Sequence, residues 1–579
     1  MKIVLAAINA KYIHSNLAVY CLKSYSKKFE EKIDIAEYTI NNQLDAIIGD
    51  LYRRKPDFIG FSCYIWNISM VYELVNEIHK LLPETKIWLG GPEVSYDAIQ
   101  VLKEHPEVDG VMVGEGEETF KELMEYYVEG KGGLSQIRGL AYRNKNTPAL
   151  TMPREQMNLS AVPFVYEQLE GFENKIIYYE SSRGCPYSCS YCLSSIDKRV
   201  RLRDTELVKK ELQFFLDHKV PQVKFVDRTF NCHPKHTLEI WNYIHEHDNG
   251  ITNFHFEVSA DILREEEFEV LSKMRPGLVQ LEIGVQSTNE ETIEAIRRKM
   301  DLTKLRKAVA RVKEGKNVHQ HLDLIIGLPY EDYKTFQTSF NEVYEMEPDQ
   351  LQIGFLKVLK GSYMHECVER YNIVYKGTSP YEVLYTKWIS YDDVLRLKAI
   401  EEMVEVYYNS GQFPNAIKYL EGFFVTPFTM FEALASYYEE KGLFERSHSR
   451  IQRFGHLLDF YKKEVGKDVE VFAELLTYDC YLREKMKSRP DFAKSNEEQY
   501  KEVVETLQEA IESGEFKLEG MEGMPMRKLI KLVHIERFSI DIENTVKAGT
   551  PIYEDQVIFF NYNERNPLNH DAKTILWKR

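Results

Sequence analysis

The sequence predicts an α/β protein with a doubly wound N-terminal domain, a partial (β/α)6 barrel and a mostly helical C-terminal domain. Short apolar runs alternate with helix-like segments from the N-terminus to about residue 378. That alternation stops at Pro380, and apolar residues then recur at helical spacing. A chain of 579 residues is also too long for one ordinary core. We expect a domain over 1–140, a linker over 141–175, the barrel over 176–378 and the C-terminal domain over 379–579.

The bulk composition narrows the class of protein. Hydrophobic residues make up 44% of the chain and aromatic residues 12%, enough to fill these cores. The formal net charge of −17 argues against electrostatic binding of nucleic acid over a broad surface. There is no run of 18 apolar residues for a membrane span, and Met1–Ala7 begins as a strand without a cleavable signal pattern. Eight cysteines in so long a chain indicate a reducing compartment, so we expect a cytoplasmic protein.

The N-terminal third alternates strands and helices. Apolar runs that read as strands cover residues 2–7, 33–38, 58–63, 86–92 and 110–116. Helical stretches cover roughly 17–29 and 44–52, and a third ends near Leu82. Such alternation predicts a doubly wound parallel sheet, in which ligands lie over the carboxyl ends of the strands.

The carboxyl ends of these expected strands are polar or rich in glycine. Glycine lets a large flat or phosphorylated ligand approach the backbone. Four such loops on one edge predict a site for a nucleotide-like cofactor. Its candidate residues are His14, Ser15, Asn16, Ser62, Tyr64, Gly90, Gly91, Pro92, Glu93, Gly114, Glu115 and Gly116.

A cysteine loop follows the first strand of the middle third, residues 176–180. Cys185, Cys189 and Cys192 have the spacing C-x3-C-x2-C. Thiolate is the soft ligand that iron–sulfur clusters select, so three converging thiolates predict a cluster with one open iron. A structural zinc site fits less well because it normally needs a second ligand pair.

Further strands in the middle third cover residues 222–226, 253–258, 278–287, 321–329 and 349–355. A helix is expected from about Asp204 to Leu216. Six βα units make a partial barrel rather than the full eight-unit one, with catalytic groups at the carboxyl ends of its strands.

The cysteine loop resembles the signature of the radical S-adenosylmethionine (radical SAM) superfamily. The resemblance implies a [4Fe–4S] cluster held by Cys185, Cys189 and Cys192, with S-adenosylmethionine (SAM) chelating the open iron through its methionyl amine and carboxylate. About the first 140 residues are similar to the cobalamin-binding domain that precedes the barrel in a large subgroup.

One departure concerns the cobalt ligand. Many cobalamin domains carry Asp-x-His-x-x-Gly, whose histidine ligates cobalt, whereas His14 stands in Tyr12-Ile13-His14-Ser15-Asn16 without that Asp or Gly. We therefore expect cobalamin to bind without a histidine ligand.

The resemblance also implies a set of SAM contacts. Tyr191 matches an aromatic residue near the adenine, and Glu257 matches a position that can hold the ribose hydroxyls. Asp227 stands where the family binds the methionyl amine, although the usual Gly-Gly-Glu pattern is absent there. The other implied contacts are Thr229, Asn231, Gln286, Ser287, Ile326 and Gly327. For Glu257 and Gln286, hydrogen bonding within the barrel is the alternative role.

The C-terminal third reads mainly as helices. These are expected over residues 427–441, 447–463 and 496–514, with Thr426 as N-cap and Pro427 at the first helical position. Residues 532–540 and 557–563 look like short strands, and residues 569–579 like a polar turn. The region resembles a helical domain of undefined role in one branch of the cobalamin subgroup.

The resemblance implies a cobalamin-dependent radical SAM enzyme that cleaves SAM to a 5′-deoxyadenosyl radical. Its leading reaction is methylation of an unactivated carbon in a small-molecule or peptide substrate, with flavodoxin or ferredoxin as reductant. A cobalamin enzyme that does not methylate, used for ring closure, ring contraction or electron relay, is one alternative. A catalytically idle sensor is a second. A third is tRNA methylthiolation, which predicts further cluster cysteines and a basic RNA module.

Overall fold

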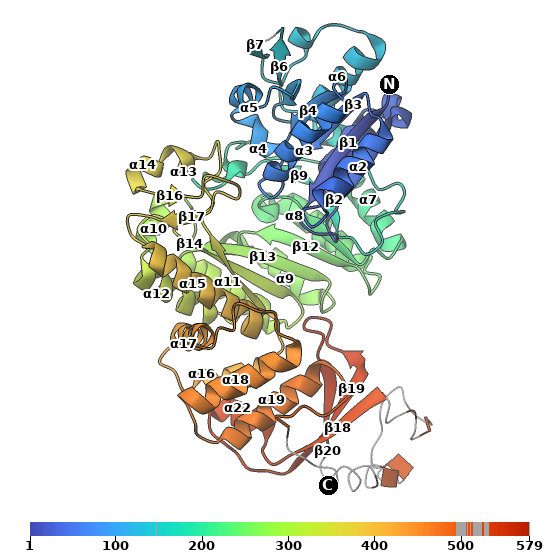
Figure 1. The fold of residues 1–579 in the computed structure, drawn as a ribbon. Coiled ribbons are helices and arrows are strands. Elements are labelled where there is room, and N and C mark those ends of the chain that lie inside the picture. The colour runs from blue at the N-terminus through green and yellow to red at the C-terminus, as the bar shows by residue number, and fades with distance from the viewer. Residues whose placement is uncertain are drawn as a thin grey trace. The chain divides into compact units, whose positions relative to one another are not determined.

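The computed structural model describes residues 1–145, 147–493 and 532–577, and eight single positions between 494 and 531 (Figure 1). The helix expected over 496–514 therefore lies outside the described residues, apart from single positions. The chain forms two compact units, Met1–Asp332 with Gly354–Tyr391, and Tyr333–Ile353 with Asp392–Arg579. Within the described ranges, none of the helices is both long and apolar enough to cross a membrane.

The first unit begins with a seven-stranded sheet in the order β2-β1-β3-β4-β5-β6-β7 (Figure 1). Its strands are β1 (Ile3–Asn9), β2 (Ile33–Thr39), β3 (Phe58–Ser62), β4 (Lys86–Gly90), β5 (Gly110–Met112), β6 (Leu140–Asn144) and β7 (Thr147–Leu150). Strands β1 to β5 pair in parallel, and β6 and β7 add an antiparallel hairpin at one edge. The hairpin covers the start of the stretch expected to be a linker, residues 141–175.

Helices cover both faces of this sheet. They are α1 (Leu17–Tyr25), α2 (Leu44–Arg54), α3 (Ile68–Leu81), α4 (Pro92–Ser95), α5 (Ala98–Glu104) and α6 (Glu117–Glu129). Because successive residues of a strand face opposite sides, Val4 of β1 joins one core with Leu74 of α3. Its neighbour Ile3 joins the other core with Phe120 of α6. The doubly wound prediction is confirmed.

A second sheet forms the partial barrel, with the strand order β8-β11-β12-β13-β14-β15. The strands are β8 (Ile177–Tyr179), β11 (Gln222–Phe225), β12 (Asn253–Val258), β13 (Val279–Gln286), β14 (His319–Ile326) and β15 (Gln350–Phe355). The helices between them are α7 (Thr205–Asp217), α8 (Pro234–Glu246), α9 (Glu265–Lys273), α10 (Glu290–Ala295) and α11 (Leu302–Glu314). The unit ends with α13 (Tyr363–Glu366), α14 (Val368–Tyr371), β16 (Val374–Tyr375) and β17 (Val383–Tyr385). Six neighbouring strands in sequence order, of which β8 and β11 to β14 pair in parallel, confirm the partial barrel.

The two faces of the barrel sheet differ in polarity. Apolar residues such as Phe254, Phe256 and Leu281 are fully buried on one face. The alternate residues of the same strands are polar and turn to the other face. These include Lys224, His255, Glu257, Glu282, Gln286, His321 and Asp323. The polar face supplies one wall of the candidate site.

The second unit is mostly helical. Its helices are α12 (Tyr333–Tyr344), α15 (Tyr391–Val404), the π-helical turn Glu405–Asn409, α16 (Pro414–Glu421), α17 (Pro427–Glu440), α18 (Arg450–Glu464), α19 (Val469–Arg483) and α22 (Ile542–Ala548). The hydroxyl of Thr426 accepts a hydrogen bond from the Thr429 amide, and Pro427 opens α17, as the sequence predicts.

A three-stranded antiparallel sheet accompanies these helices, with β18 (Val533–Phe538), β19 (Gln556–Arg565) and β20 (Ala572–Trp577). The first two strands match the expected ones. The expectation of a polar turn over 569–579 is wrong, because β20 pairs with β19 from Val557↔Trp577 onward. Exposed polar residues such as Lys573 on this edge strand hide the strand pattern in the sequence.

Candidate functional site

The cysteine loop is closed at its base by a short pair of strands. β9 (Ser182–Arg183) pairs antiparallel with β10 (Arg201–Leu202), and the loop lies between them. Gly184 has a φ of +99°, and an added Cβ would lie 2.5 Å from the carbonyl oxygen of Arg199. The Cys185 amide donates a hydrogen bond of 2.9 Å to the Asp197 carbonyl. Glycine is therefore required where the chain enters the loop.

All three loop cysteines line one cavity of about 170 Å³. Cys185 and Cys189 are buried, and Cys192 is partly exposed. No three His, Cys, Asp or Glu side chains in the described ranges are grouped tightly enough for a single metal ion. Three separate thiols around a cavity are the donor set of a multinuclear iron–sulfur cluster with one site open, so these residues fit that group.

Residues after β11 support the loop and the cavity. Thr229 lines the cavity, with its Oγ1 3.6 Å from the Sγ of Cys185. Asp227 is fully buried, and its carboxylate accepts hydrogen bonds from the Ser181 amide and from the hydroxyls of Ser181 and Ser182. Burial raises the pKa of Asp227 to about 6, against the effect of these hydrogen bonds. Asp227 thus holds the segment that leads into the cysteine loop.

Asn231 has a similar supporting position. Its side chain donates to the Ser259 carbonyl and accepts from the Ser259 amide, at 2.8 and 2.9 Å. These bonds join the ends of β11 and β12. Neither Asp227 nor Asn231 is among the residues that line the cavity.

Carboxylates from three neighbouring strands line the same cavity. They are Glu257 of β12, Glu282 of β13 and Asp323 of β14. The sheet register places Glu257 beside Glu282, and Asp323 beside Gly284. Arg228 reaches to 3.7 Å from Glu257. Burial raises the pKa of Glu257 to about 7.

The charge of Glu282 is compensated by neighbours on the same polar face. Lys224 Nζ lies 2.9 Å and His255 Nε2 3.0 Å from its Oε2. Burial raises the pKa of Glu282, but the bonds from His255 and Lys224 outweigh it and hold the pKa well below its usual range. Asp323 forms no ion pair with Lys or Arg among the described residues; burial first, then Glu282 and Glu257, raise its pKa, although Lys224 and Arg298 act against them.

Two buried oxygens of the cavity wall have no hydrogen-bond partner among the described residues. They are Oε1 of Gln286 and Oδ1 of Asp323. His321 Nε2 lies 3.5 Å from the Asp323 oxygen. The backbone of Gln286 has a φ of +72°, which is unusual for a residue other than glycine. Buried acceptors without donors are costly, so this wall fits a bound group that supplies hydrogen-bond donors.

The remaining expected SAM residues divide into two sets. Tyr191 lines the cavity, and the Arg298 guanidinium lies 3.4 Å from its hydroxyl and 3.8 Å from the Sγ of Cys189. Ser287, Ile326 and Gly327 are not among the lining residues. Ser287 donates to Glu331, and the Ile326 carbonyl accepts from the Leu356 amide. Gly327 has a φ of +89°, and an added Cβ would lie 2.7 Å from Val383.

Sequence reasoning missed several lining residues, namely Tyr187, Arg228, Ser259, Glu282, Gly284, Arg298, Lys299 and Asp323. A signal for some of them was present. Gln280, Glu282 and Gln286 alternate with apolar residues in β13, and His321 and Asp323 do so in β14. This alternation at the carboxyl ends of strands indicates a polar barrel face.

At the N-terminal sheet, several expected cobalamin residues contact the barrel side of the same unit. His14 Nδ1 is 2.6 Å from the Tyr178 hydroxyl, and Ser15 donates to the Ile176 carbonyl. Burial lowers the pKa of His14. Asn16 Nδ2 donates to the Ser62 hydroxyl at 3.1 Å. The loop after β1 therefore joins the two sheets of the first unit.

The two acidic residues at the carboxyl edge of the N-terminal sheet also form ion pairs or hydrogen bonds with other parts of the chain. Glu115 pairs with Arg201 and Arg183, and its carboxylate accepts from the Met157 amide. Glu93 accepts a hydrogen bond from the Tyr381 hydroxyl. These two carboxylates, expected at cobalamin, hold neighbouring segments together.

The other expected cobalamin residues are glycines, a proline and an aromatic residue at the strand ends. Tyr64 stacks on Trp66, with ring centroids 4.4 Å apart. Gly91 has a φ of +117°, where a Cβ would lie 2.4 Å from the Cys63 carbonyl. Gly114 has a φ of +82° and nothing within 4 Å of an added Cβ. Gly90 ends β4, Pro92 opens α4 and Gly116 is the N-cap of α6.

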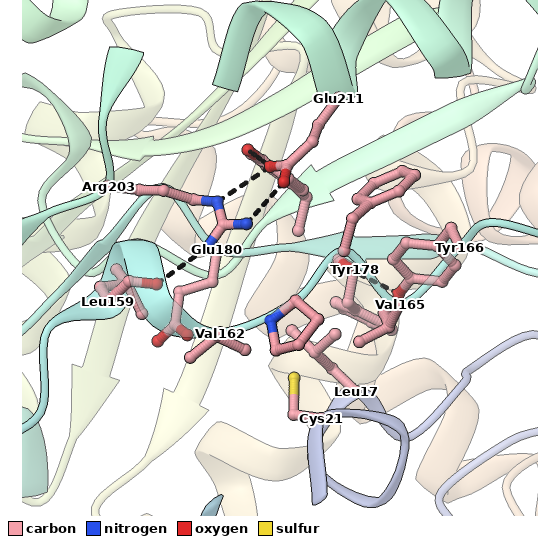
Figure 2. A pocket seen from close by; sticks show the side chains of 13 residues that line it. Leu17, Cys21, Leu159, Val162, Val165, Tyr166, Tyr178, Glu180, Arg203 and Glu211 are labelled. Atoms are coloured by element: carbon pink, nitrogen blue, oxygen red, sulfur yellow. Dashed lines mark hydrogen bonds and ion pairs between the residues drawn. The ribbon is translucent and has the colours of Figure 1, made fainter. Parts of the chain in front are cut away.

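A second, smaller cavity of about 30 Å³ lies where α1 meets residues 159–166 and the barrel (Figure 2). Leu17 and Cys21 line one side of it, and Arg203 pairs with Glu211 on another. Arg203 also donates to the Leu159 carbonyl at 2.7 Å. A space this small holds about one water molecule. It is a packed junction, and the cavity beside the cysteines is the candidate site.

Three family models match separate parts of the chain. A B12 binding domain matches residues 3–124, and the radical SAM superfamily matches residues 179–343. A model described as a protein of unknown function (DUF4080) matches residues 369–560. The order of these models agrees with the three parts expected from the sequence.

Curated relatives match about half of the chain. The cobalamin-dependent radical SAM methyltransferase TokK of Streptomyces tokunonensis is 26% identical over 342 residues, 55% of this chain and 50% of TokK. The 2-(S-pantetheinyl)-carbapenam-3-carboxylate methyltransferase of Streptantibioticus cattleyicolor is 27% identical over 310 residues, 50% of this chain and 45% of that protein. The chain thus spans about half the length of these relatives.

Solved structures share the fold at low identity. OxsB, a cobalamin-dependent S-adenosylmethionine radical enzyme with aqua-cobalamin and S-adenosylmethionine bound, matches with a TM-score of 0.57 and 16% identity, over 95% of this chain and 83% of OxsB. The radical S-adenosylmethionine methyltransferase TsrM of Kitasatospora setae matches with a TM-score of 0.54 and 16% identity, over 64% of this chain and 77% of TsrM. The chain therefore carries, in this order, a region that matches a B12 binding domain, a region that matches the radical SAM superfamily and a C-terminal region that matches DUF4080.

Proposed function

We propose that the protein is a cobalamin-dependent radical SAM enzyme that methylates an unactivated carbon of a small-molecule or peptide substrate. The observation that carries the proposal is the single cavity shared by three free thiols and by unpartnered acceptors from Gln286 and Asp323. Methyltransferases among the relatives support the reaction class.

In this proposal Cys185, Cys189 and Cys192 hold a [4Fe–4S] cluster, and Tyr191, Thr229, Glu257 and Gln286 contact SAM. Loops at the carboxyl edge of the N-terminal sheet hold cobalamin, through the glycines at 90, 91, 114 and 116 and through Tyr64. When bound, the cluster and SAM supply a 5′-deoxyadenosyl radical, and methylcobalamin supplies a methyl group.

In this proposal the residues of the chain itself orient the bound groups in the cavity. Asp227 and Asn231 fix the segments on both sides of the cavity, as their hydrogen bonds to Ser181, Ser182 and Ser259 indicate. Gln286 is positioned at the carboxyl end of β13 by a backbone with a φ of +72°. Groups that are already positioned hold the reactants in the reactive geometry without a reorganisation free energy during the reaction.

A cobalamin enzyme that does not methylate is the second candidate. Anaerobic magnesium-protoporphyrin IX monomethyl ester cyclase of Rubrivivax gelatinosus is 22% identical over 321 residues, 53% of this chain and 57% of that protein. That likeness favours ring closure over the sensor and tRNA alternatives. Cys21 and Cys63 are the cysteines of the N-terminal domain, and two thiols are too few to hold a second cluster.

We further propose a cytoplasmic setting and a flavodoxin or ferredoxin as electron donor. All eight cysteines are free, in keeping with a reducing compartment.

Anaerobic reconstitution tests the function. We expect an iron–sulfur absorption band, bound cobalamin, and 5′-deoxyadenosine from SAM under reductant. Cys185→Ala should lose the band and the SAM cleavage but keep cobalamin. If the protein forms a cluster and cleaves SAM but does not bind cobalamin, the methyl-transfer part of the proposal is wrong. If no cluster forms, the whole proposal is overturned.

A further inference from the structure

One glutamate joins the loop after β5 to the two short strands that close the cysteine loop. Glu115 is the middle residue of the loop of residues 114–116, which is expected at cobalamin. Its Oε1 accepts a hydrogen bond from the Arg201 guanidinium of β10 and lies 3.6 Å from Nη1 of Arg183 in β9. Its Oε2 accepts from the Met157 amide at 3.1 Å. A single side chain therefore reaches both strands at the base of the cysteine loop.

The two arginines share this anion because they stand opposite each other. Arg201 is the register partner of Arg183, and the β9–β10 ladder contains just one further residue pair. Like charges directly opposite each other destabilise a pair of strands. Other carboxylates pair with one arginine each, namely Glu117 and Glu180 with Arg183, and Asp197 with Arg201. Glu115 contacts both arginines and so offsets the repulsion between them.

The contacts continue from Arg201 to the first cysteine. The Arg201 guanidinium lies 2.8 Å from the Asp197 carboxylate, and the Asp197 carbonyl accepts from the Cys185 amide at 2.9 Å. The Arg201 side chain is only 9% exposed, so its charge depends on carboxylates rather than on water. Glu115, Arg201 and Asp197 therefore connect residues 114–116 to Cys185.

Glycines on both sides of Glu115 give its loop a backbone with wide conformational freedom. At Gly114 the φ is +82°, and nothing lies within 4 Å of an added Cβ. Burial raises the pKa of Glu115, but the hydrogen bonds from Arg201 and Met157 and the charges of both arginines outweigh it and lower the pKa overall. The carboxylate is therefore charged at neutral pH, and its contacts to the arginines restrict the conformations of the loop.

We propose that Glu115 is a positioning residue that couples the cobalamin site to the cluster site. Its backbone neighbours form the loop for cobalamin, and its carboxylate stabilises the strand pair that closes the cysteine loop. Cobalamin binding and cluster loading then favour one another by the same factor, because coupling between two binding sites is reciprocal. The inference rests on the proposed function, because it needs both cofactors.

The test measures cobalamin binding with and without the cluster. Hydroxocobalamin is titrated anaerobically into the iron-free and the cluster-loaded full chain, and the ratio of the two dissociation constants is determined for each variant. Glu115→Gln removes the charge and keeps the shape. The matched control is Asp109→Asn, just before β5, because Asp109 also pairs with a cation, Lys86 at 3.1 Å, and accepts from a backbone amide, that of Ile87. A uniform loss of affinity cancels in the ratio.

We expect the cluster to strengthen cobalamin binding at least about fivefold in the wild type and in Asp109→Asn, and less than about twofold in Glu115→Gln. Iron retained against a chelator should increase with added cobalamin in the first two proteins and stay constant in Glu115→Gln. Arg201→Lys keeps the positive charge but loses the branched guanidinium, so its ratio should be intermediate. This variant also tests the inference if Glu115→Gln does not fold.

The inference is wrong if the ratio is near one in the wild type, if Glu115→Gln or Arg201→Lys keeps the wild-type ratio, or if Asp109→Asn loses it to the same extent. In each of these cases the wild type still binds both cofactors, and the proposed function stands. If the wild type forms no cluster or binds no cobalamin, the corresponding part of the proposed function fails, and the inference fails with it.

Discussion

Glu257 has a pKa of about 7 because burial disfavours its charged form, so its charge changes near neutral pH. An ionised carboxylate accepts hydrogen bonds from hydroxyl groups more strongly than a neutral one. If Glu257 holds the ribose of SAM, the affinity for SAM should rise as the pH rises through about 7, by about fivefold. Glu257→Gln should show a flatter dependence. Equilibrium dialysis of SAM from pH 5.5 to 8.5 measures both, and equal slopes in the two proteins would contradict the assignment.

A second prediction at the residue scale concerns the ion pair between Lys224 and Glu282. Glu282→Gln leaves Lys224 without its carboxylate and should lower the free energy of unfolding by about 1–3 kcal/mol at pH 7. The Glu282 pKa is depressed, so its contribution is present above the unfolded pKa of about 4 and is lost as the pH falls below it.

A double-mutant cycle with Lys224→Met, followed by urea unfolding, measures this coupling. The control is the same cycle on the exposed pair Lys80 and Glu77, where about 0.5 kcal/mol or less is expected. Equal coupling in the two cycles would show that the polar barrel face gains nothing from this contact.

At the scale of elements, the entry to the cysteine loop depends on a residue without a side chain. Gly184→Ala meets both a positive φ and a carbonyl oxygen 2.5 Å from the new Cβ. Gly114→Ala is the matched control, with a positive φ and open space around the new Cβ. We expect about 1 kcal/mol of strain in the control and more in Gly184→Ala. Iron per chain after reconstitution should fall clearly only in Gly184→Ala; normal iron in both variants would contradict the requirement.

The strands of the three larger sheets show which elements can be predicted from the sequence and which cannot. The existence of the strands followed from short apolar runs, because such patterns are local. The extra strand β20 was missed, because an edge strand with exposed polar residues lacks the apolar pattern. The hairpin β6–β7 was expected as linker, since Pro148 and polar residues interrupt it.

At the scale of the whole first unit, a partly buried ion pair joins the N-terminal sheet to the segment before β8. Lys175 Nζ is 2.9 Å from Glu37, and the two side chains are 11% and 13% exposed. Glu37 also accepts from Asn9, Asn16 and Tyr20. Although burial raises the pKa of Glu37, Lys175 and these hydrogen bonds outweigh it and lower the pKa overall. The carboxylate therefore stays charged at neutral pH and depends on its cation.

Lys175→Met should cost about 3 kcal/mol, because it leaves a buried carboxylate without its cation. Lys80→Met removes an exposed helical pair and should cost less than about 0.5 kcal/mol. Urea unfolding at pH 7 compares them. Similar losses in both variants would show that the pair does not hold the two sheets together.

The sequence by itself determined the cluster motif, the order of the domains and the cofactor classes. Cysteine spacing, strand alternation and glycine positions are local properties that can be read along one chain. Only the tertiary structure decided which polar residues share the cavity. Glu282, Asp323 and Arg298 meet there because strand register and a helix end bring separate segments together. It also decided that Asp227 holds Ser181 and Ser182 and that Glu115 pairs with arginines, because partners distant in sequence are chosen by packing.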